Sequence, residues 1–487
     1  MKRKWLIITD RMDGLYRAAL RRLTAAIAPY TASVLPVLSP DEIPTELPAD
    51  AGLILLGTPK TGTTVTPYIE KGLLTLPEGE ESYGIYVGED PKEKESTRIV
   101  IAGRGERGVL YGCVDLCNRY LGEELFREKD LWREDLFDAP LDAPLPDWSV
   151  SVSPAIAHRG LWTWGHVIYD YRSYLENMLT LRMNELVIWN DRAPINAKEI
   201  VDHAHALGIR VLYGFSWGWG VDCKKLLFSF DAEEAERLKC SVLSTYEKEY
   251  ASCGCDGIYF QSFTETTEES VAGKCIADTV TELVNDIGGT LLSRYPSLRL
   301  QFGLHATSVA PHLDAIQRVD PRIQIVWEDC GAFPYDYYPS HTTDFKKTLS
   351  LTEKLLVLRG EEERFGAVLK GMTKLDWTRF SHFDAPYLCG ERSEAFLDER
   401  LAKKRKLWKL LQADWLENAE YARRTVAAVA KHGEHATLQA LVEDGLFERE
   451  IPFPAALFAE MLWESETAVT RLIARVAKYP AITFANL

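Results

Sequence analysis

The sequence lacks the features that would place a protein in a membrane or outside the cell. No apolar run approaches the roughly 18 residues of a membrane span. The N-terminal apolar stretch ends at Thr9 and Asp10, too early for the core of a signal peptide, and no small-residue cleavage site follows it. The nine cysteines are odd in number and scattered, which favours reduced thiols over a disulfide framework. These absences predict a cytoplasmic protein without membrane association.

Positive charge, phosphate loops and metal motifs are also scarce. The chain has 72 acidic and 56 basic residues and a formal net charge of -16, whereas a nucleic-acid interface needs a basic face. Cys253-Gly254-Cys255 is one residue short of a Cys-x-x-Cys motif, and residues 57–64 have the glycine spacing of a phosphate loop without its lysine. We therefore expect no nucleic-acid partner, no metal and no organic cofactor.

What the chain does contain is a mixed α/β pattern over residues 1–150. Strands are predicted at Trp5–Thr9 and Ala51–Leu56, a hairpin joins Tyr83–Val87 to Arg98–Ile101, and helices are predicted at Leu15–Ile27 and Gly108–Tyr120. Residues 138–154 are rich in Pro, Asp and Ser and resemble a linker. This region is predicted to be a small α/β domain.

Residues 151–390 alternate short apolar runs with helical segments, the pattern of a parallel α/β architecture. The predicted strands are Ala155–Leu161, Glu185–Trp189, Arg210–Gly214, Gly257–Gln261, Arg299–Gly303, Gln324–Trp327, Gly366–Gly371 and Ala385–Leu388. Eight such units match a (β/α)8 TIM barrel; a doubly wound open sheet is the alternative, but it normally has fewer units and a glycine-rich turn.

Residues 391–487 are predicted to form a helical C-terminal domain. The predicted helices are Leu397–Leu416, Tyr421–Lys431, Thr437–Glu443 and Ala455–Val476. Their apolar faces could bury a homodimer contact or pack on the barrel.

The C-terminal ends of barrel strands carry the active site in this fold. Here nearly every such end combines an aromatic residue with a polar or charged one, and the candidates for substrate binding are Trp164, His166, Asp191, Trp217, Trp219, His305, Trp327, Asp376 and Trp377. Sugars present flat apolar faces and many hydroxyl groups, which aromatic rings and charged hydrogen-bonding groups recognise. The pattern predicts a carbohydrate substrate.

Glycoside hydrolysis usually needs two carboxyl groups, one as acid and one as base or nucleophile. Glu265 follows an apolar strand in a short polar turn and is the predicted acid, although it could instead be an N-terminal helix residue. Glu328 and Asp329 are its predicted partners, followed by Asp376; a salt bridge at the barrel rim is the alternative role for each. Arg159 could bind hydroxyls or a carboxylate, or form an ion pair.

Two segments resemble family 20 β-N-acetylhexosaminidases. Residues 103–112 resemble the end of the small domain that precedes the barrel, and Arg159-Gly160, followed by the helix that ends in Arg182-Met183-Asn184, resembles the opening of that barrel. The resemblance implies that Arg159 binds sugar hydroxyls and that Glu265 is the acid. Thr264 stands where the family has the Asp that orients the substrate's acetamido group. The segment from Asp256 to Glu265 also resembles family 67 α-glucuronidases.

The sequence therefore predicts an exo-acting glycoside hydrolase for small oligosaccharides, hexosaminidase-like, with two-carboxylate chemistry. The alternatives are a non-catalytic carbohydrate-binding protein on a degenerate barrel, an α-glucuronidase-like enzyme, and a metal-dependent isomerase or lyase that uses Glu265, His305 and Glu328. The sequence leaves open the sugar, its linkage and the stereochemical course.

Overall fold

A computed structural model describes most of the chain. The described residues are 4–28, 31, 35–44, 47, 51–60, 64–90, 97–124, 141, 145, 147–164, 168–190, 192–218, 230–266, 268–271, 273–331, 344–360, 363–373, 386–390, 392–432, 435–442 and 447–485. They fold into two compact units. The first comprises residues 1–154, 206–208 and 473–482, and the second comprises residues 155–205, 209–472 and 483–487.

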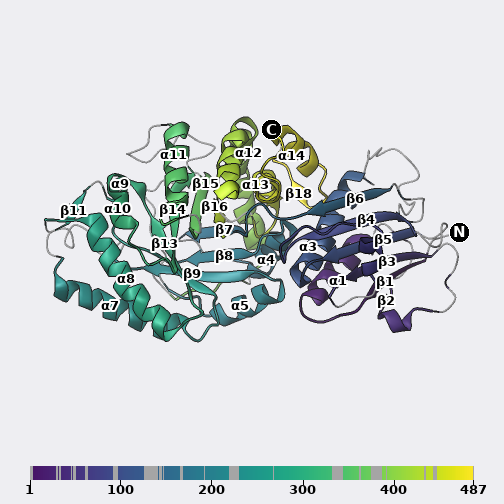
Figure 1. Cartoon of the computed structure of the whole chain (residues 1–487), viewed down its shortest axis with the longest axis horizontal. Coiled ribbons are helices and arrows are strands. Elements are labelled where there is room, and N and C mark those ends of the chain that lie inside the picture. Colours follow the sequence, from purple (N-terminus) through teal and green to yellow (C-terminus); the bar gives the residue numbers. More distant parts are fainter. Residues whose placement is uncertain are drawn as a thin grey trace. The chain divides into compact units, whose positions relative to one another are not determined.

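A six-stranded sheet organises the first unit (Figure 1). Its strands are β1 (Trp5–Thr9), β2 (Val37–Leu38), β3 (Gly52–Gly57), β4 (Tyr83–Glu89), β5 (Thr97–Gly103) and β6 (Trp148–Val152). The spatial order is β2-β1-β3-β5-β4-β6; β1, β2, β3 and β5 are parallel, and β4 runs antiparallel to both β5 and β6. The predicted hairpin is the β4–β5 pair.

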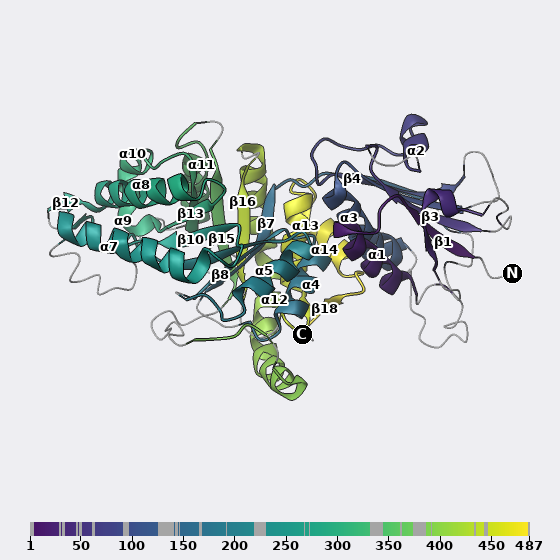
Figure 2. The same cartoon turned by 90° about the horizontal axis from the view of Figure 1, so that it is seen from below.

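Helices cover the sheet because its strands are apolar on both faces. Ile8, Leu53 and Val100 face a cluster that includes Tyr68 of α2 (Thr66–Glu70). On the other face, Ile101 lies against Gly112 of α3 (Glu106–Asp115). The remaining helices of this unit are η2 (Pro40–Glu42), α1 (Gly14–Ile27), which packs against α3, and η3 (Leu116–Glu124), which continues it (Figure 2).

The second unit is built on a closed barrel of eight parallel strands, the predicted TIM barrel. The strands are β7 (His158–Trp164), β8 (Glu185–Trp189), β9 (Arg210–Ser216), β10 (Gly257–Gln261), β13 (Arg299–Leu304), β14 (Ile323–Gly331), β15 (Phe365–Met372) and β16 (Thr437–Val442). Two short hairpin strands, β11 (Ser270–Val271) and β12 (Lys274–Cys275), and two further short strands, β17 (Ile451–Pro452) and β18 (Ile482–Thr483), lie outside the barrel.

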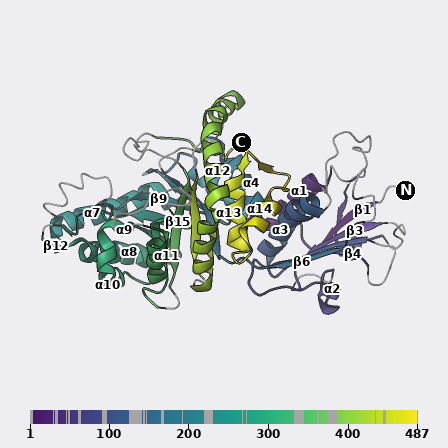
Figure 3. The ribbon, with the colours of Figure 1, turned by 90° about the horizontal axis from the view of Figure 1, so that it is seen from above.

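Helices surround the barrel strands (Figure 1). They are α4 (Tyr171–Thr180), α5 (Ala197–Ala206), α7 (Ala232–Thr245) with η6 (Tyr246–Tyr250), α8 (Ile276–Arg294), α9 (Ala306–Val309), η7 (Ala310–His312), α10 (Leu313–Ile316), α11 (Phe345–Leu356), α12 (Glu394–His432) and α13 (Phe453–Trp463). The last helix, α14 (Val469–Val476), ends in residues that belong to the first unit. The 39-residue α12 packs beside α13 (Figure 3). Within the described part of the chain, no helix combines the length and apolar character that a membrane span requires.

The eighth barrel strand differs from the prediction. Residues 386–388 form no strand, and Thr437–Val442, predicted as part of a helix, is the strand β16 that closes the barrel between β15 and β7. All six residues of β16 are buried, so its sequence lacks the polar alternation that marks a half-exposed strand. The barrel therefore extends beyond residue 390, and most of the predicted C-terminal domain belongs to the barrel unit.

Side chains fill the barrel in layers, as alternation along parallel strands requires. The polar layer near the strand starts includes Glu185, whose Oε1 accepts hydrogen bonds from the side-chain amides of Gln301 and Gln439. An apolar layer follows, formed by Trp162, Val187, Leu212, Tyr259, Val326, Val368 and Leu441. Strand residues two positions further on, such as Glu328, point inward again near the C-terminal ends. The polar residues around Glu185, near the strand starts, are thus separated by an apolar layer from Glu328, near the strand ends.

Candidate active site

Glu328 is the central polar residue at the C-terminal end of the barrel. It lies on β14, two residues after the inward-facing Val326, and is 1% exposed. Tyr259 Oη and Gln261 Nε2, both on β10, donate hydrogen bonds of 2.5 Å to its two oxygens. Each oxygen therefore has a hydrogen-bond donor, as a buried carboxyl group requires.

The hydrogen bonds to Glu328 require a glycine on the neighbouring strand. Gly303 lies on β13, and a Cβ atom there would overlap Glu328 Oε1 and come within 2.5 Å of Tyr259 Oη. Any side chain at this position would therefore displace the carboxylate or the phenol. The sequence of β13 thus leaves room for the polar contact between its neighbours β10 and β14.

His305 joins Glu328 to the second carboxylate of the site. Its Nε2 lies 3.2 Å from Glu328 Oε2 and 3.8 Å from Glu265 Oε2. The imidazole is 5% exposed, whereas the Glu265 side chain is 49% exposed. One imidazole nitrogen therefore lies between a buried and a solvent-accessible carboxylate. The structure brings together three residues that the sequence predicted for the site.

Hydrogen bonds between Thr264 and residues after β13 hold the turn that carries Glu265. Thr264 is fully buried, its carbonyl accepts a 2.5 Å hydrogen bond from Ser308 Oγ, and its hydroxyl accepts one of 3.4 Å from the backbone N–H of His305. These contacts connect the loop after β10 to the loop after β13. The side chain of Glu265 itself is not buried.

Aromatic rings form the barrel interior next to Glu328. Trp164 stacks on Trp162 with a centroid distance of 6.3 Å and an interplanar angle of 9°, and Trp162 meets the Tyr259 ring edge-on at 5.5 Å. Trp189 also meets Tyr259 edge-on, at 5.8 Å. Trp164 thus lies at the C-terminal end of its strand, and the rings of Trp162, Tyr259 and Trp189 form one aromatic cluster with it.

Two of the tryptophans predicted to contact the substrate, Trp217 and Trp327, lie elsewhere. Trp217 stacks on Phe260 at 3.5 Å, and Phe260 points outward because its neighbours Tyr259 and Gln261 point inward. Trp327 is fully buried and alternates with Val326 and Glu328, so its ring also lies on the outer side of the barrel wall. Both are corrected to packing residues between strands and helices.

Arg159 is also corrected. It is the second residue of β7, at the opposite end of the strand from the site, and is fully buried. Its guanidinium donates to the carbonyl groups of Ile156, Ala157 and Arg182 and stacks on the Trp463 ring. The arginine therefore stabilises the junction of β7 with the surrounding helices, and the predicted sugar contact is not available to it.

Several other predicted residues lie outside the described part of the chain. They are His166, Asp191, Trp219, Asp376 and Trp377, and for Asp329 the backbone is described but the side chain is not. Their roles in binding or catalysis stay predictions.

Sequence reasoning missed Tyr259 and Gln261, although a signal was present. Both lie in a short, otherwise apolar strand and are two residues apart, so they share one face. A polar pair on one face of a buried strand must find partners inside the barrel. As for metals, no group of three His, Cys, Asp or Glu side chains within the described residues is arranged to hold an ion.

Comparisons with known proteins support the fold assignment. No protein-family model and no curated protein matches the sequence. Among solved structures, a β-N-acetylhexosaminidase from Bacteroides fragilis is 12% identical with a TM-score of 0.51, covering 100% of this chain and 93% of that one. A GH138 enzyme targeting pectin rhamnogalacturonan II is 12% identical with a TM-score of 0.50, covering 96% of this chain.

The chain spans only 51% of that GH138 enzyme. A GH20 β-N-acetylhexosaminidase from Streptomyces coelicolor is 14% identical with a TM-score of 0.45, covering 99% of this chain and 93% of that one. The Bacteroides fragilis and GH138 structures are glycoside hydrolases, and the likeness to them supports the barrel architecture.

Proposed function

We propose that this protein is a glycoside hydrolase in which Glu265 and Glu328 act on one glycosidic bond. The observation that carries the proposal is the placement of two carboxylates on either side of His305 Nε2 at the C-terminal end of the barrel. Barrel enzymes place their chemistry at this end, and most glycosidases use a pair of carboxyl groups there. The glycoside hydrolases among the structural neighbours agree with this class of reaction.

The two carboxylates differ in environment, as the two roles require. Glu328 is buried and accepts hydrogen bonds from Tyr259 and Gln261, so it can act as the base or nucleophile or stabilise positive charge at the anomeric carbon. Glu265 is half-exposed and can exchange protons with water. In the proposed reaction Glu265 protonates the leaving oxygen as the glycosidic C–O bond breaks. Water or Glu328 then forms the new bond to the anomeric carbon.

His305 is a positioning residue in this scheme. Its Nε2 approaches both carboxylates, so it reduces their mutual repulsion when protonated and fixes the orientation of Glu328 when neutral. Its backbone N–H contacts Thr264 Oγ1, which ties the imidazole to the turn that carries Glu265. Displacement of His305 would therefore disturb both carboxyl groups.

Thr264 favours a reaction that uses two protein carboxylates. Its side chain is short, neutral and buried, and its polar atoms face Ser308 and His305. Position 264 therefore supplies no carboxylate that could hold a substrate acetamido group. We infer exo-action on small oligosaccharides, with Trp164 as an apolar surface beneath the sugar. We also infer that the substrate is bound without recognition of an N-acetyl group.

A substrate screen tests the proposal. The full-length protein would be assayed with aryl α- and β-glycosides, including N-acetylhexosaminides and glucuronides, and with pectin-derived oligosaccharides. We expect turnover of at least one substrate, lost by about 10²- to 10⁴-fold in Glu265→Gln, as for removal of a general acid. Glu268→Gln, which alters an exposed carboxylate nearby, should retain wild-type activity.

The same screen separates catalysis from binding. Saturable sugar binding without turnover by a folded protein would support the carbohydrate-binding alternative. Turnover that is equal in the wild type and Glu265→Gln would contradict the role of Glu265.

A further inference from the structure

A basic pocket opens at the other end of the barrel, where the strands begin. Its volume is about 320 Å³, and its basic lining residues are the arginines Arg210, Arg299, Arg322 and Arg364 and the histidines His158 and His435. Each of these six residues starts or closely precedes a different barrel strand, namely β7, β9, β13, β14, β15 and β16. The concentration of positive charge is notable because the chain as a whole has a net charge of -16.

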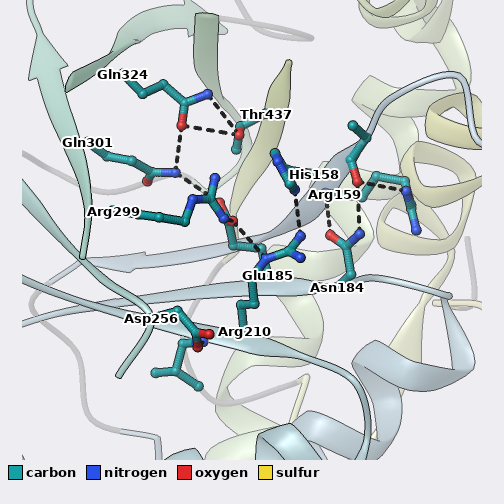
Figure 4. Close-up of polar contacts among 12 residues, drawn as sticks. His158, Arg159, Asn184, Glu185, Arg210, Asp256, Arg299, Gln301, Gln324 and Thr437 are labelled. Atoms are coloured by element: carbon teal, nitrogen blue, oxygen red, sulfur yellow. Dashed lines mark hydrogen bonds and ion pairs between the residues drawn. The ribbon is translucent and has the colours of Figure 1, made fainter. Parts of the chain in front are cut away.

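Glu185 compensates part of this charge from inside the barrel (Figure 4). It is fully buried, and its Oε2 lies 2.6 Å from Arg299 Nη1 and 3.5 Å from Arg210 Nε. Burial opposes its ionisation, but Arg299, His158 and Arg210 outweigh that effect and lower the pKa of Glu185 to about 2. Glu185 is therefore an anion at any physiological pH and holds two guanidinium groups together.

Among the residues that the structure describes, the remaining acidic groups near the pocket do not balance the arginines. Asp320 pairs with Arg322 at 2.6 Å. Asp256 Oδ2 accepts a hydrogen bond from the Val211 backbone N–H and lies 2.9 Å from His205 Nε2. Arg364 is exposed, and among the described residues no acidic partner is seen for it. Four guanidinium groups thus line a pocket in which two of the carboxylates, Glu185 and Asp320, pair with them.

We propose that this pocket binds a small oxyanion of the phosphate class. Guanidinium groups recognise phosphate oxygens through paired, charge-assisted N–H donors. A volume of about 320 Å³ lies at the small end of the range for ligand sites and accommodates inorganic phosphate or a phosphorylated monosaccharide. Arg210 Nη2 also lies 2.5 Å from His158 Nδ1, so the imidazole belongs to the same polar cluster.

The proposed site is independent of the proposed hydrolysis. The strand starts and the strand ends are separated by the apolar layer that includes Val187, Tyr259 and Val326. A ligand at the basic pocket therefore cannot contact Glu265 or Glu328, and failure of either proposal leaves the other standing.

Calorimetric titration of the full-length protein with inorganic phosphate at low salt tests the site. We expect saturable binding, weakened about tenfold in Arg364→Gln because one charge-assisted contact is lost. Arg364 makes no contact with Glu185, so its replacement should preserve the fold. The matched control is Arg237→Gln, which removes an exposed arginine from α7 that pairs with Glu233 and Glu234; its phosphate affinity should stay within twofold of the wild type.

Two further titrations, with glucose 6-phosphate and with glucose, identify the source of the oxyanion. Tighter binding of the sugar phosphate than of phosphate would assign the pocket to a phosphorylated sugar, and equal binding would assign it to the free anion. Absence of saturable binding of either anion by folded protein, or equal weakening in Arg364→Gln and Arg237→Gln, would overturn the proposal.

Discussion

The two ends of the barrel each bury a glutamate, and their surroundings differ in kind. Glu185, near the strand starts, is held by two arginines and by the amides of Gln301 and Gln439. Glu328, near the strand ends, is held by a phenol, an amide and an imidazole that also approaches a second carboxylate. Permanent cations fix the charge of Glu185, whereas the partners of Glu328 are neutral or titratable.

In the proposed mechanism, this difference distinguishes Glu185, a structural carboxylate, from Glu328, a reactive one. The charge of a carboxylate paired with arginines is already balanced. Such a carboxylate therefore stabilises positive charge on a ligand only weakly. A carboxylate held mainly by neutral donors can respond to positive charge that develops on a substrate. Burial alone would not distinguish Glu185 from Glu328, since both are nearly inaccessible.

The largest expected effect is on catalysis in Glu328→Gln. The substitution preserves the shape of the side chain and removes the negative charge that, in the proposed reaction, faces the anomeric carbon. We expect kcat to fall by at least about 10³-fold on the substrate found in the screen, with thermal unfolding close to that of the wild type. Steady-state kinetics and differential scanning calorimetry measure the two quantities. Near wild-type kcat would remove Glu328 from the mechanism.

The reverse pattern is expected for Glu185→Gln. Loss of the charge leaves Arg299 and Arg210 uncompensated next to the barrel core, which should lower the free energy of unfolding by about 3 kcal/mol. Urea denaturation measures the loss, and kcat of the folded variant should match the wild type. A neutral effect on stability would mean that the arginines find compensation elsewhere and would weaken the contrast between the two glutamates.

Gly303→Ala tests whether the packing around Glu328 matters for its chemistry. The added methyl group would overlap Glu328 Oε1 and approach Tyr259 Oη. We expect destabilisation of about 1–3 kcal/mol, as for overpacking, together with a fall in kcat. Gly289→Ala is a matched control, because a Cβ atom there meets no neighbouring atom within 4 Å. Equal behaviour of the two variants would contradict the tight contact.

A smaller effect is expected from Tyr259→Phe. It removes one of the hydrogen bonds to Glu328 and keeps the ring that contacts Trp162 and Trp189. We expect kcat to fall about tenfold, the scale of one hydrogen bond to a charged group. Tyr213→Phe removes a buried hydroxyl that donates to the Ala197 carbonyl and should leave kcat unchanged. Similar kcat values for both variants would show that the Tyr259 hydroxyl is only structural.

The smallest effect concerns acid stability. The pKa of Glu185 is lowered in the folded state, so its contribution to stability is complete above its ordinary pKa of 4.5 and is lost as the pH falls toward about 2. The difference in unfolding free energy between wild type and Glu185→Gln should therefore narrow below pH 4.5. Urea titrations at several pH values measure it, and a difference that stays constant down to pH 3 would contradict the lowered pKa.

Much of the barrel could be predicted from the sequence, because parallel strands produce short apolar runs between helices. Glu185–Trp189 and Gly257–Gln261 have the predicted bounds. Thr437–Val442 was mistaken for a helix because all its residues are buried, which removes the alternation that identifies a strand. Residues 437–442 form a strand because they pair with β7 and β15, which are distant in sequence. No local sequence pattern contains that information.

The site was predictable in part for a similar reason. The rule that chemistry lies at strand ends identified Glu265, His305 and Glu328, which the structure brings together. It could not tell which side of the wall a residue faces. Alternation could have done so: Trp327 is adjacent to Glu328, so the two cannot both point into the barrel. The contacts of Arg159 depend on Trp463, which is distant in sequence.

The most direct test of the account is the leaving-group dependence of Glu265→Gln. A general acid is needed most when the leaving group is a poor one, such as another sugar, and least when it is an activated phenol. We predict that the variant loses at least about 10²-fold in kcat/KM on an oligosaccharide and much less on the matching dinitrophenyl glycoside. Equal losses on both substrates would contradict the assignment of Glu265 as the acid that works with Glu328.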